Sequence, residues 1–110
     1  MTISSQAQTE QALKKLSRLA RNGQVSDSLA RNIQKLLGNE INQLVLDLAA
    51  TEKDLAAFEQ EYNLSTTEFF KRWQAGQTDD RMDYGEWASL AQMADNLHQR
   101  LDLLQGGTPK

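Results

Sequence analysis

The sequence predicts an all-α protein, with a long central helix followed by a C-terminal antiparallel helical hairpin. Apolar residues recur at steps of three or four over most of the chain, the spacing of one helix face. One proline and six glycines among 110 residues leave long stretches free of helix breakers. Strand-like alternation of apolar and polar residues does not accompany this pattern. These observations favour extended helices over a sheet.

Composition narrows the class of protein. The chain has no cysteine, which excludes a disulfide framework and thiolate metal sites. No apolar run approaches the roughly 20 residues that span a bilayer. The first residues lack the basic and apolar regions of a signal peptide. We therefore expect a soluble cytoplasmic protein with no membrane contact.

A first helix is expected from about Thr9 to Arg21, after a polar start. Its leucines share one face, and Asn22-Gly23 ends it, because glycine readily adopts the left-handed conformation found after a helix. Its other face is basic. The basic side chains are Lys14, Lys15, Arg18 and Arg21.

A second, much longer helix follows, with Ser26 or Asp27 as its cap. If continuous to Tyr62, it would measure about 50 Å. Gly38 is its weakest point, because a glycine inside a helix costs about 1 kcal/mol relative to alanine. The apolar stripe keeps its phase across this glycine, so we expect continuity with a bend. The stripe comprises Leu29, Ile33, Leu36, Leu37, Ile41, Leu44, Val45, Leu48, Leu55, Phe58 and Tyr62.

A short third helix is expected from Thr66 to Gln74. Asn63 ends the long helix before it, and Ser65 with Glu68 has the spacing of a capping box. In such a box the serine accepts from the first turn while the glutamate reaches back. Gly76 ends this helix.

The last helix is expected to begin at Asp83, whose spacing to Glu86 repeats that of a capping box. Its apolar residues fall at alternating steps of three and four, as in a coiled-coil seam. This seam and that of the long helix should fold back on one another. The seam residues are Trp87, Leu90, Ala94, Leu97, Leu101 and Leu104.

Charge is divided unevenly along the chain. Residues 1–38 hold six basic and two acidic residues, a net charge of +4, and residues 39–110 hold six and thirteen, a net charge of −7. We divide the chain into a basic N-terminal helical region (1–38), a helical hairpin with a short connecting helix (39–105) and a disordered tail (106–110). The long apolar stripe exceeds what the flanking helices can cover, so we expect a homo-oligomer.

A motif occupies the C-terminal half, within residues 52–101. Its residues are Phe58, Glu59, Tyr62, Leu64, Ser65, Phe69, Gly76, Asp80, Met82, Asp83, Tyr84, Glu86 and Trp87. It resembles the pattern Phe-Glu-x-x-Tyr-x-Leu/Met-Ser-x-x-x-Phe, a glycine turn, and Asp-Asp-x-Met-Asp-aromatic-x-Glu-Trp of a family of small uncharacterised prokaryotic proteins, common in cyanobacteria and archaea. The resemblance implies an antitoxin-like protein encoded beside a small toxin. The acidic pair Asp79-Asp80 is shifted by one position from that pattern, and Gly85 replaces a bulkier residue.

We expect no catalytic site, no metal site and no cofactor. His98 is the only histidine, and without cysteine neither a zinc site nor a Cys/His pair can form. The acidic residues of the turn lack the ligand spacing of a calcium loop. Helix capping accounts for Asp83 and Glu86, and a solvated turn accounts for Asp79 and Asp80.

The aromatic residues around the turn are more numerous than a small hairpin needs. We expect Phe69 and Trp87 in the core. Phe70 and Trp73 are the expected partner-binding pair, since Phe70 directly follows Phe69 and cannot share its direction, and exposed aromatic residues mark protein interfaces. The structural motif around them comprises Tyr62, Ser65, Glu68, Phe69, Gly76, Asp83, Glu86 and Trp87.

Three functions remain open. We favour a non-enzymatic protein-binding module. Its most specific form is a protein that neutralises a small cognate toxin. A structural coiled-coil or scaffold subunit is the second. A small DNA-binding regulator is the third, with nucleic-acid contact through Lys14, Lys15, Arg18 and Arg21. The second helix is far longer than a recognition helix, which disfavours a helix-turn-helix. Binding of the isolated protein to DNA is expected to be weak or absent.

Overall fold

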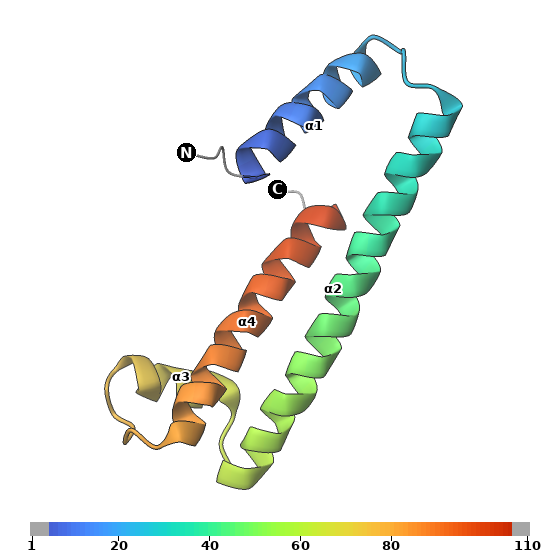
Figure 1. The fold of residues 1–110 in the computed structure, drawn as a ribbon. Helices are drawn as coiled ribbons and strands as arrows, with labels where there is room; N and C mark the ends of the chain where they lie inside the picture. The colour runs from blue at the N-terminus through green and yellow to red at the C-terminus, as the bar shows by residue number, and fades with distance from the viewer. Residues whose placement is uncertain (1–4, 107–110) are drawn as a thin grey trace. The chain divides into compact units, whose positions relative to one another are not determined.

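The computed structural model describes residues 5–106, and these form helices joined by turns, with no strand among them (Figure 1). The all-α fold class is confirmed. The tail predicted at 106–110 lies outside the described residues except for Gly106, and so do residues 1–4. The helices are α1 (Ser5–Arg21), α2 (Asp27–Tyr62), α3 (Thr66–Gln74) and α4 (Met82–Leu104).

Contacts group the chain into two units, Met1–Leu36 and Leu37–Lys110. The division falls inside α2, which is helical on both sides of it. Gly38 lies within this helix, so the helix does not break there. The two units are described separately below.

The first unit contains α1 and the first turns of α2. The prediction that α1 begins near Thr9 is wrong: it begins at Ser5, whose carbonyl accepts from the Thr9 hydroxyl at 2.7 Å. Gly23, with φ of 66°, ends α1 as predicted. Ser26 caps α2, accepting from the Leu29 N–H at 3.1 Å. None of the residues of α1 is buried, so this unit has little core of its own.

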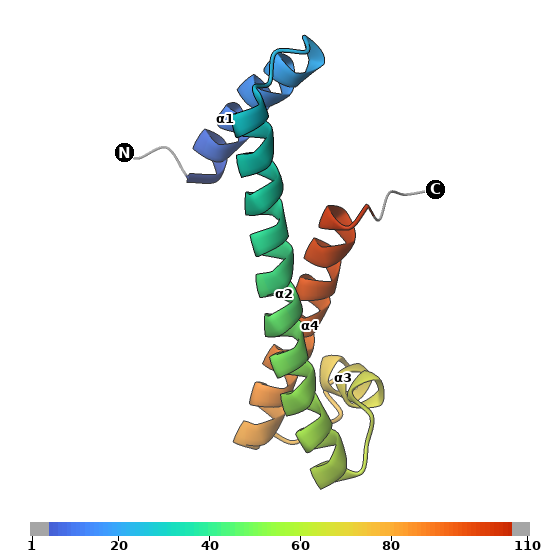
Figure 2. The ribbon, with the colours of Figure 1, turned by 90° about the vertical axis from the view of Figure 1, so that its right-hand side faces the viewer.

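In the second unit, α4 lies antiparallel to the C-terminal part of α2, and α3 lies beside the start of α4 (Figures 1 and 2). The predicted packing of α2 against α4 is confirmed. A cluster of buried aliphatic side chains joins these two helices. Its members are Leu44, Leu48, Ala94, Leu97 and Leu101, with Ile41, Leu55 and Leu104 packed against them.

A second cluster, at the α3 end of this unit, is aromatic. The rings of Phe69 and Trp87 are parallel within 1° and their centroids are 3.9 Å apart. Phe58 and Tyr62 from α2 lie 5.6 and 5.7 Å from the Trp87 ring. The indole Nε1–H donates to the Thr66 hydroxyl at 3.0 Å, so the buried polar atom is satisfied. Trp87 and Phe69 are the largest fully buried side chains described, at 0% and 1% exposure.

Trp87→Ala should lower the free energy of unfolding by about 3–5 kcal/mol, because it leaves a cavity between three helices and removes the donor to Thr66. Denaturant unfolding followed by helix circular dichroism measures the change. Leu46→Ala is the control in the same unit, since Leu46 is 64% exposed and should change stability by no more than about 0.5 kcal/mol. Equal losses in the two variants would contradict the placement of Trp87.

Candidate functional site

The turn between α3 and α4 is held by a defined helix stop. Gly76 has φ of 70°, a left-handed conformation. Its N–H donates to the Trp73 carbonyl at 3.1 Å, and the Gln77 N–H donates to the Arg72 carbonyl at 2.8 Å. This pair of bonds is a Schellman motif. Gly76 therefore satisfies the end of α3 and sets the direction in which the chain leaves it.

The capping box predicted at the start of α3 forms only in part. Ser65 is the N-cap and accepts from the Glu68 N–H at 3.1 Å. The Glu68 carboxylate, which a capping box would turn back to Ser65, instead lies 3.2 Å from Arg72 Nε. Glu59, on the last turns of α2, accepts from the Thr66 N–H at 2.7 Å. Only the serine half of the predicted box therefore forms, and Glu59 ties α2 to the start of α3.

The predicted cap of α4 by Asp83 is wrong. The helix begins at Met82, and its N-cap is Arg81, which makes no side-chain capping bond. Asp83 lies in the first turn, and its Oδ2 accepts from the Tyr62 hydroxyl at 2.6 Å. A carboxylate in the first turn still benefits from the helix dipole. The physical reason for the difference is that the phenol of α2 offers a stronger donor to this carboxylate than the backbone of its own turn.

Arg81 links the turn to two aromatic rings. Its guanidinium carbon lies 5.0 Å from the Tyr84 centroid and 5.8 Å from that of Tyr62. The same guanidinium makes two bonds of 3.2 Å to the two carboxylate oxygens of Asp79. These bonds, with the Arg81 N–H, lower the pKa of Asp79, and they raise the pKa of Arg81. Nothing in the local sequence pattern indicated this clamp, because loop residues two positions apart have no fixed geometry.

Phe70 and Trp73 each lie half-buried. Both pack against the aromatic cluster of Phe69, Trp87 and Ala88, so they contribute to the core as well as to the surface. Phe70 borders two shallow grooves between α3 and α4, of about 560 and 510 Å³. Gln74 and Gln92 also line both grooves, and Trp73 lines the larger one. We call the surface formed by Phe70, Trp73, Gln74 and Gln92 the α3–α4 face.

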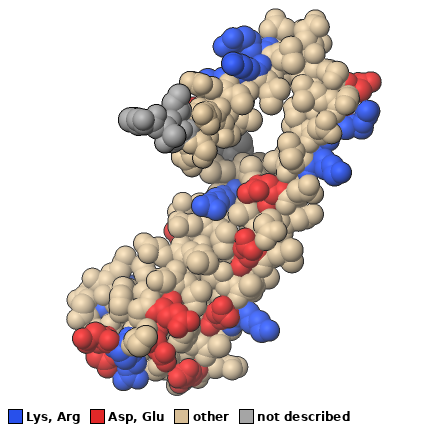
Figure 3. Space-filling model, in the orientation of Figure 1, with Lys and Arg blue, Asp and Glu red and all other residues tan. Residues whose placement is uncertain are grey.

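The acidic residues of the turn do not converge. Within residues 5–106, no three His, Asp or Glu side chains group as metal ligands would. Asp79 is paired with Arg81 and Asp83 with Tyr62, and Lys and Arg lie among Asp and Glu over this end of the unit (Figure 3). His98 lies apart from them, with its Nε2 3.4 Å from a Glu52 carboxylate oxygen on the exposed surface.

The four basic residues of α1 are all exposed. Lys14, Lys15, Arg18 and Arg21 project from a helix with no acidic residue in its first turn. They belong to the first unit, whereas the α3–α4 face belongs to the second. The basic residues and the aromatic residues are therefore features of different units.

No protein family, curated protein or solved structure that was compared matches this chain. None of the helices within residues 5–106 combines the length and apolarity needed to cross a bilayer. The candidate site combines the exposed edges of Phe70 and Trp73 with the neighbouring glutamines Gln74 and Gln92. The turn beside it is held by the bonds from Arg81 to Asp79.

The bond from Tyr62 to Asp83 predicts a specific pH dependence. This hydrogen bond, followed by burial, raises the pKa of Tyr62 above its ordinary value, which is about 10. The native state then holds the phenolic proton more tightly than the unfolded state. This contribution to stability is fully present below about pH 10 and is lost as the pH rises through the native pKa of Tyr62.

Tyrosinate absorbance measures this directly. The difference between the wild-type protein and Tyr62→Phe should titrate above about pH 10. Asp83→Asn should move that difference back toward the ordinary pKa, because an amide accepts more weakly than a carboxylate. A Tyr62 signal that titrates at its ordinary pKa in the wild-type protein would contradict the strength of this bond in solution.

Proposed function

We propose that this chain is a cytoplasmic, non-enzymatic protein-binding module whose α3–α4 face receives a partner protein. The sharpest version is an antitoxin-like protein that neutralises a small cognate toxin. The observation that carries the proposal is the pair of grooves on either side of Phe70. The antitoxin role has one further support, which is the resemblance of the C-terminal motif to a family of small prokaryotic proteins.

The chemistry of the α3–α4 face supports a protein partner. Phe70 and Trp73 each present part of an aromatic ring, and aromatic residues are enriched in the centres of protein interfaces. Gln74 and Gln92 beside them offer amide donors and acceptors for a polar rim. The grooves are shallow and lie between helices, which suits side chains of a protein better than a small molecule that needs to be enclosed.

The rigidity of the surrounding structure supports the same proposal. Trp87 stacks on Phe69, directly beneath the exposed aromatic edge. Arg81 and the Tyr62–Asp83 bond hold the adjoining turn. A surface whose side chains are already ordered loses less conformational entropy on binding.

Substitution of Gln74 tests the proposal without disturbing the core. Gln74→Arg places a long charged side chain across both grooves, and Gln74 itself is exposed. Capture of the product of an adjacent reading frame by co-purification should weaken at least about tenfold, while the melting temperature stays unchanged. Gln60→Arg, at an exposed position of α2, is the matched control and should capture the partner normally.

Phe70→Ala completes the experiment. It should weaken capture and also lower stability, because Phe70 packs against the buried aromatic cluster. Normal capture by both Gln74→Arg and Phe70→Ala would place the partner elsewhere on the chain. Loss of capture in Gln60→Arg as well would show that the effect is not specific to this face.

DNA binding is the second candidate function, because the four basic residues of α1 are exposed and could contact phosphates. We expect the isolated protein to bind DNA weakly. Its affinity should fall with salt, with a slope no steeper than about −3.6, because each of four phosphate contacts contributes about −0.9. Fluorescence anisotropy in a salt series, with Lys14→Gln/Lys15→Gln for comparison, measures this. Tight, sequence-selective binding at physiological salt would favour the regulator over the protein-binding module.

A further inference from the structure

One side of α4 carries a stripe of exposed side chains with heptad spacing. Six of its seven members directly precede a residue of the α2-facing seam, so the stripe faces about 100° around the helix from α2. Ala88 is buried against α3 and lies outside the stripe, although it lines one groove together with Ser89. All seven residues are exposed. The α4 stripe comprises Met82, Glu86, Ser89, Met93, Asn96, Arg100 and Leu103.

The large apolar side chains that α4 exposes all belong to this stripe. Met82, Met93 and Leu103 are 91%, 49% and 79% exposed. Single exposed apolar residues are ordinary on protein surfaces. Here they lie 11 and 10 residues apart, close to three helical turns each, so all three lie on the same side of α4.

A groove of about 630 Å³ between α2 and α4 adjoins the middle of the α4 stripe. The α2 side of this groove is formed partly by small residues, which leave room for side chains of a third helix to enter as knobs. Four members of the stripe help to form the other side. The α2 residues are Asp47, Ala50 and Thr51, and the α4 residues are Gln92 and Leu97 with the stripe residues Ser89, Met93, Asn96 and Arg100.

Read from either end, the α4 stripe has the same order of residue types: apolar, charged, polar and then the central Met93. An apolar residue stands at each end, Met82 and Leu103. A charged residue follows inward on each side, acidic at Glu86 and basic at Arg100. Ser89 and Asn96 come next, and Met93 is central. A stripe with opposite charges at mirrored positions matches a second copy of itself only when that copy runs in the opposite direction.

We propose that α4 pairs, in antiparallel orientation, with α4 of a second copy of this chain about a two-fold axis near Met93. Glu86 then lies opposite Arg100 of the second copy, and the symmetry forms this pair twice. Met82 lies opposite the second copy's Leu103. A parallel pairing would place each charge opposite its like, which is unfavourable.

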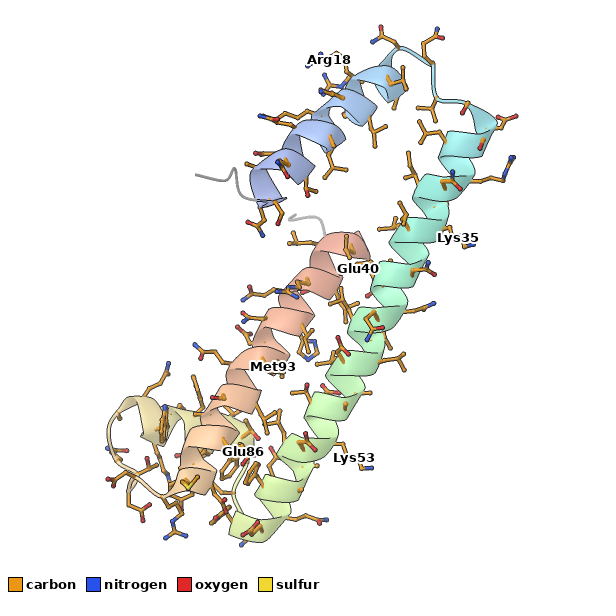
Figure 4. The ribbon with its side chains drawn as sticks, in the orientation of Figure 1. Arg18, Lys35, Glu40, Lys53, Glu86 and Met93 are labelled. Carbon is orange, nitrogen blue, oxygen red and sulfur yellow. The ribbon has the colours of Figure 1, made fainter. Side chains whose placement is uncertain are left out.

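The charges of the α4 stripe are available for such pairing. Neither Glu86 nor Arg100 forms an ion pair within residues 5–106, and both are exposed. Glu86 and Met93 lie about two turns apart on α4 (Figure 4). The α4 stripe adjoins the α3–α4 face, since Ser89 lines a groove on each side of it. The inference rests on the charges and apolar residues of the stripe and uses neither Phe70 nor Trp73.

Charge reversal and charge exchange test both the pairing and its direction. Glu86→Arg alone, or Arg100→Glu alone, places like charges opposite one another twice and should weaken the dimer at least about tenfold. The double variant Glu86→Arg/Arg100→Glu should restore it. Mixing the two single variants should also restore a dimer, because each then faces its opposite. Sedimentation over a concentration series measures the mass, and circular dichroism checks that each variant is helical.

Lys53→Glu is the charge-reversal control. Lys53 projects from α2 away from α4 (Figure 4), so this variant should sediment as the wild-type protein does. A wild-type protein that stays monomeric to about 100 µM, well above the concentrations at which specific dimers form, would overturn the proposal. Single variants that dimerise normally, or a double variant that stays weak, would overturn this register.

A single cysteine gives a second readout, because the natural chain has none. Met93→Cys places two thiols beside the two-fold axis, within the short distance that a disulfide requires, and should cross-link under mild oxidation. Lys53→Cys should not. Equal cross-linking of both variants, or none of Met93→Cys, would contradict an axis near residue 93.

Discussion

Trp87 has no exposed surface and contacts aromatic rings of both other helices in its unit. Its face-to-face contact with Phe69 fixes α3 to α4, while its contacts with Phe58 and Tyr62 fix α4 to α2. The short helix α3 could not hold its position alone, since isolated helices of its length are marginal in water. The indole therefore helps to set the direction of α3 and the grooves it borders, together with the bond from the Thr66 N–H to Glu59.

The second unit gives each side of α4 a different environment. One side is buried against α2 through Ala94, Leu97 and Leu101, and another meets α3 through Ala88. The third side is the α4 stripe, which keeps apolar residues in solvent. The first unit lacks such a division, because no residue of α1 is buried. Both buried clusters therefore lie in the second unit, and the net positive charge lies in the first.

Periodicity in the sequence predicts the two long helices well, because steps of three and four leave little choice of fold over so many residues. Gly23, Asn63 and Gly76 also mark helix ends correctly, since each has a positive φ in the structure. Local spacing failed at Asp83, where a hydroxyl 21 positions earlier in the chain competes with the backbone for the carboxylate.

The half-buried positions of Phe70 and Trp73 also could not be obtained from adjacency to Phe69. Adjacent helix residues point in different directions, but the packing of α3 on the start of α4 brings neighbouring sides of α3 against one cluster. The same limit applies to Arg81, whose two aromatic contacts come from different helices. Contacts between residues far apart in the chain cannot be predicted from the pattern of a few neighbouring residues.

Two side-chain bonds each connect residues 21 positions apart: Tyr62 to Asp83, and Trp87 to Thr66. In each, a change at one end leaves a polar group at the other without its partner, at a cost of about 1–3 kcal/mol where it stays buried. A phenylalanine at position 87 would favour an apolar residue at position 66, and a phenylalanine at position 62 would relax the need for an acid at position 83. Over evolutionary time these positions should therefore change as pairs, and the divergence of this fold should proceed through coupled substitutions across the turn.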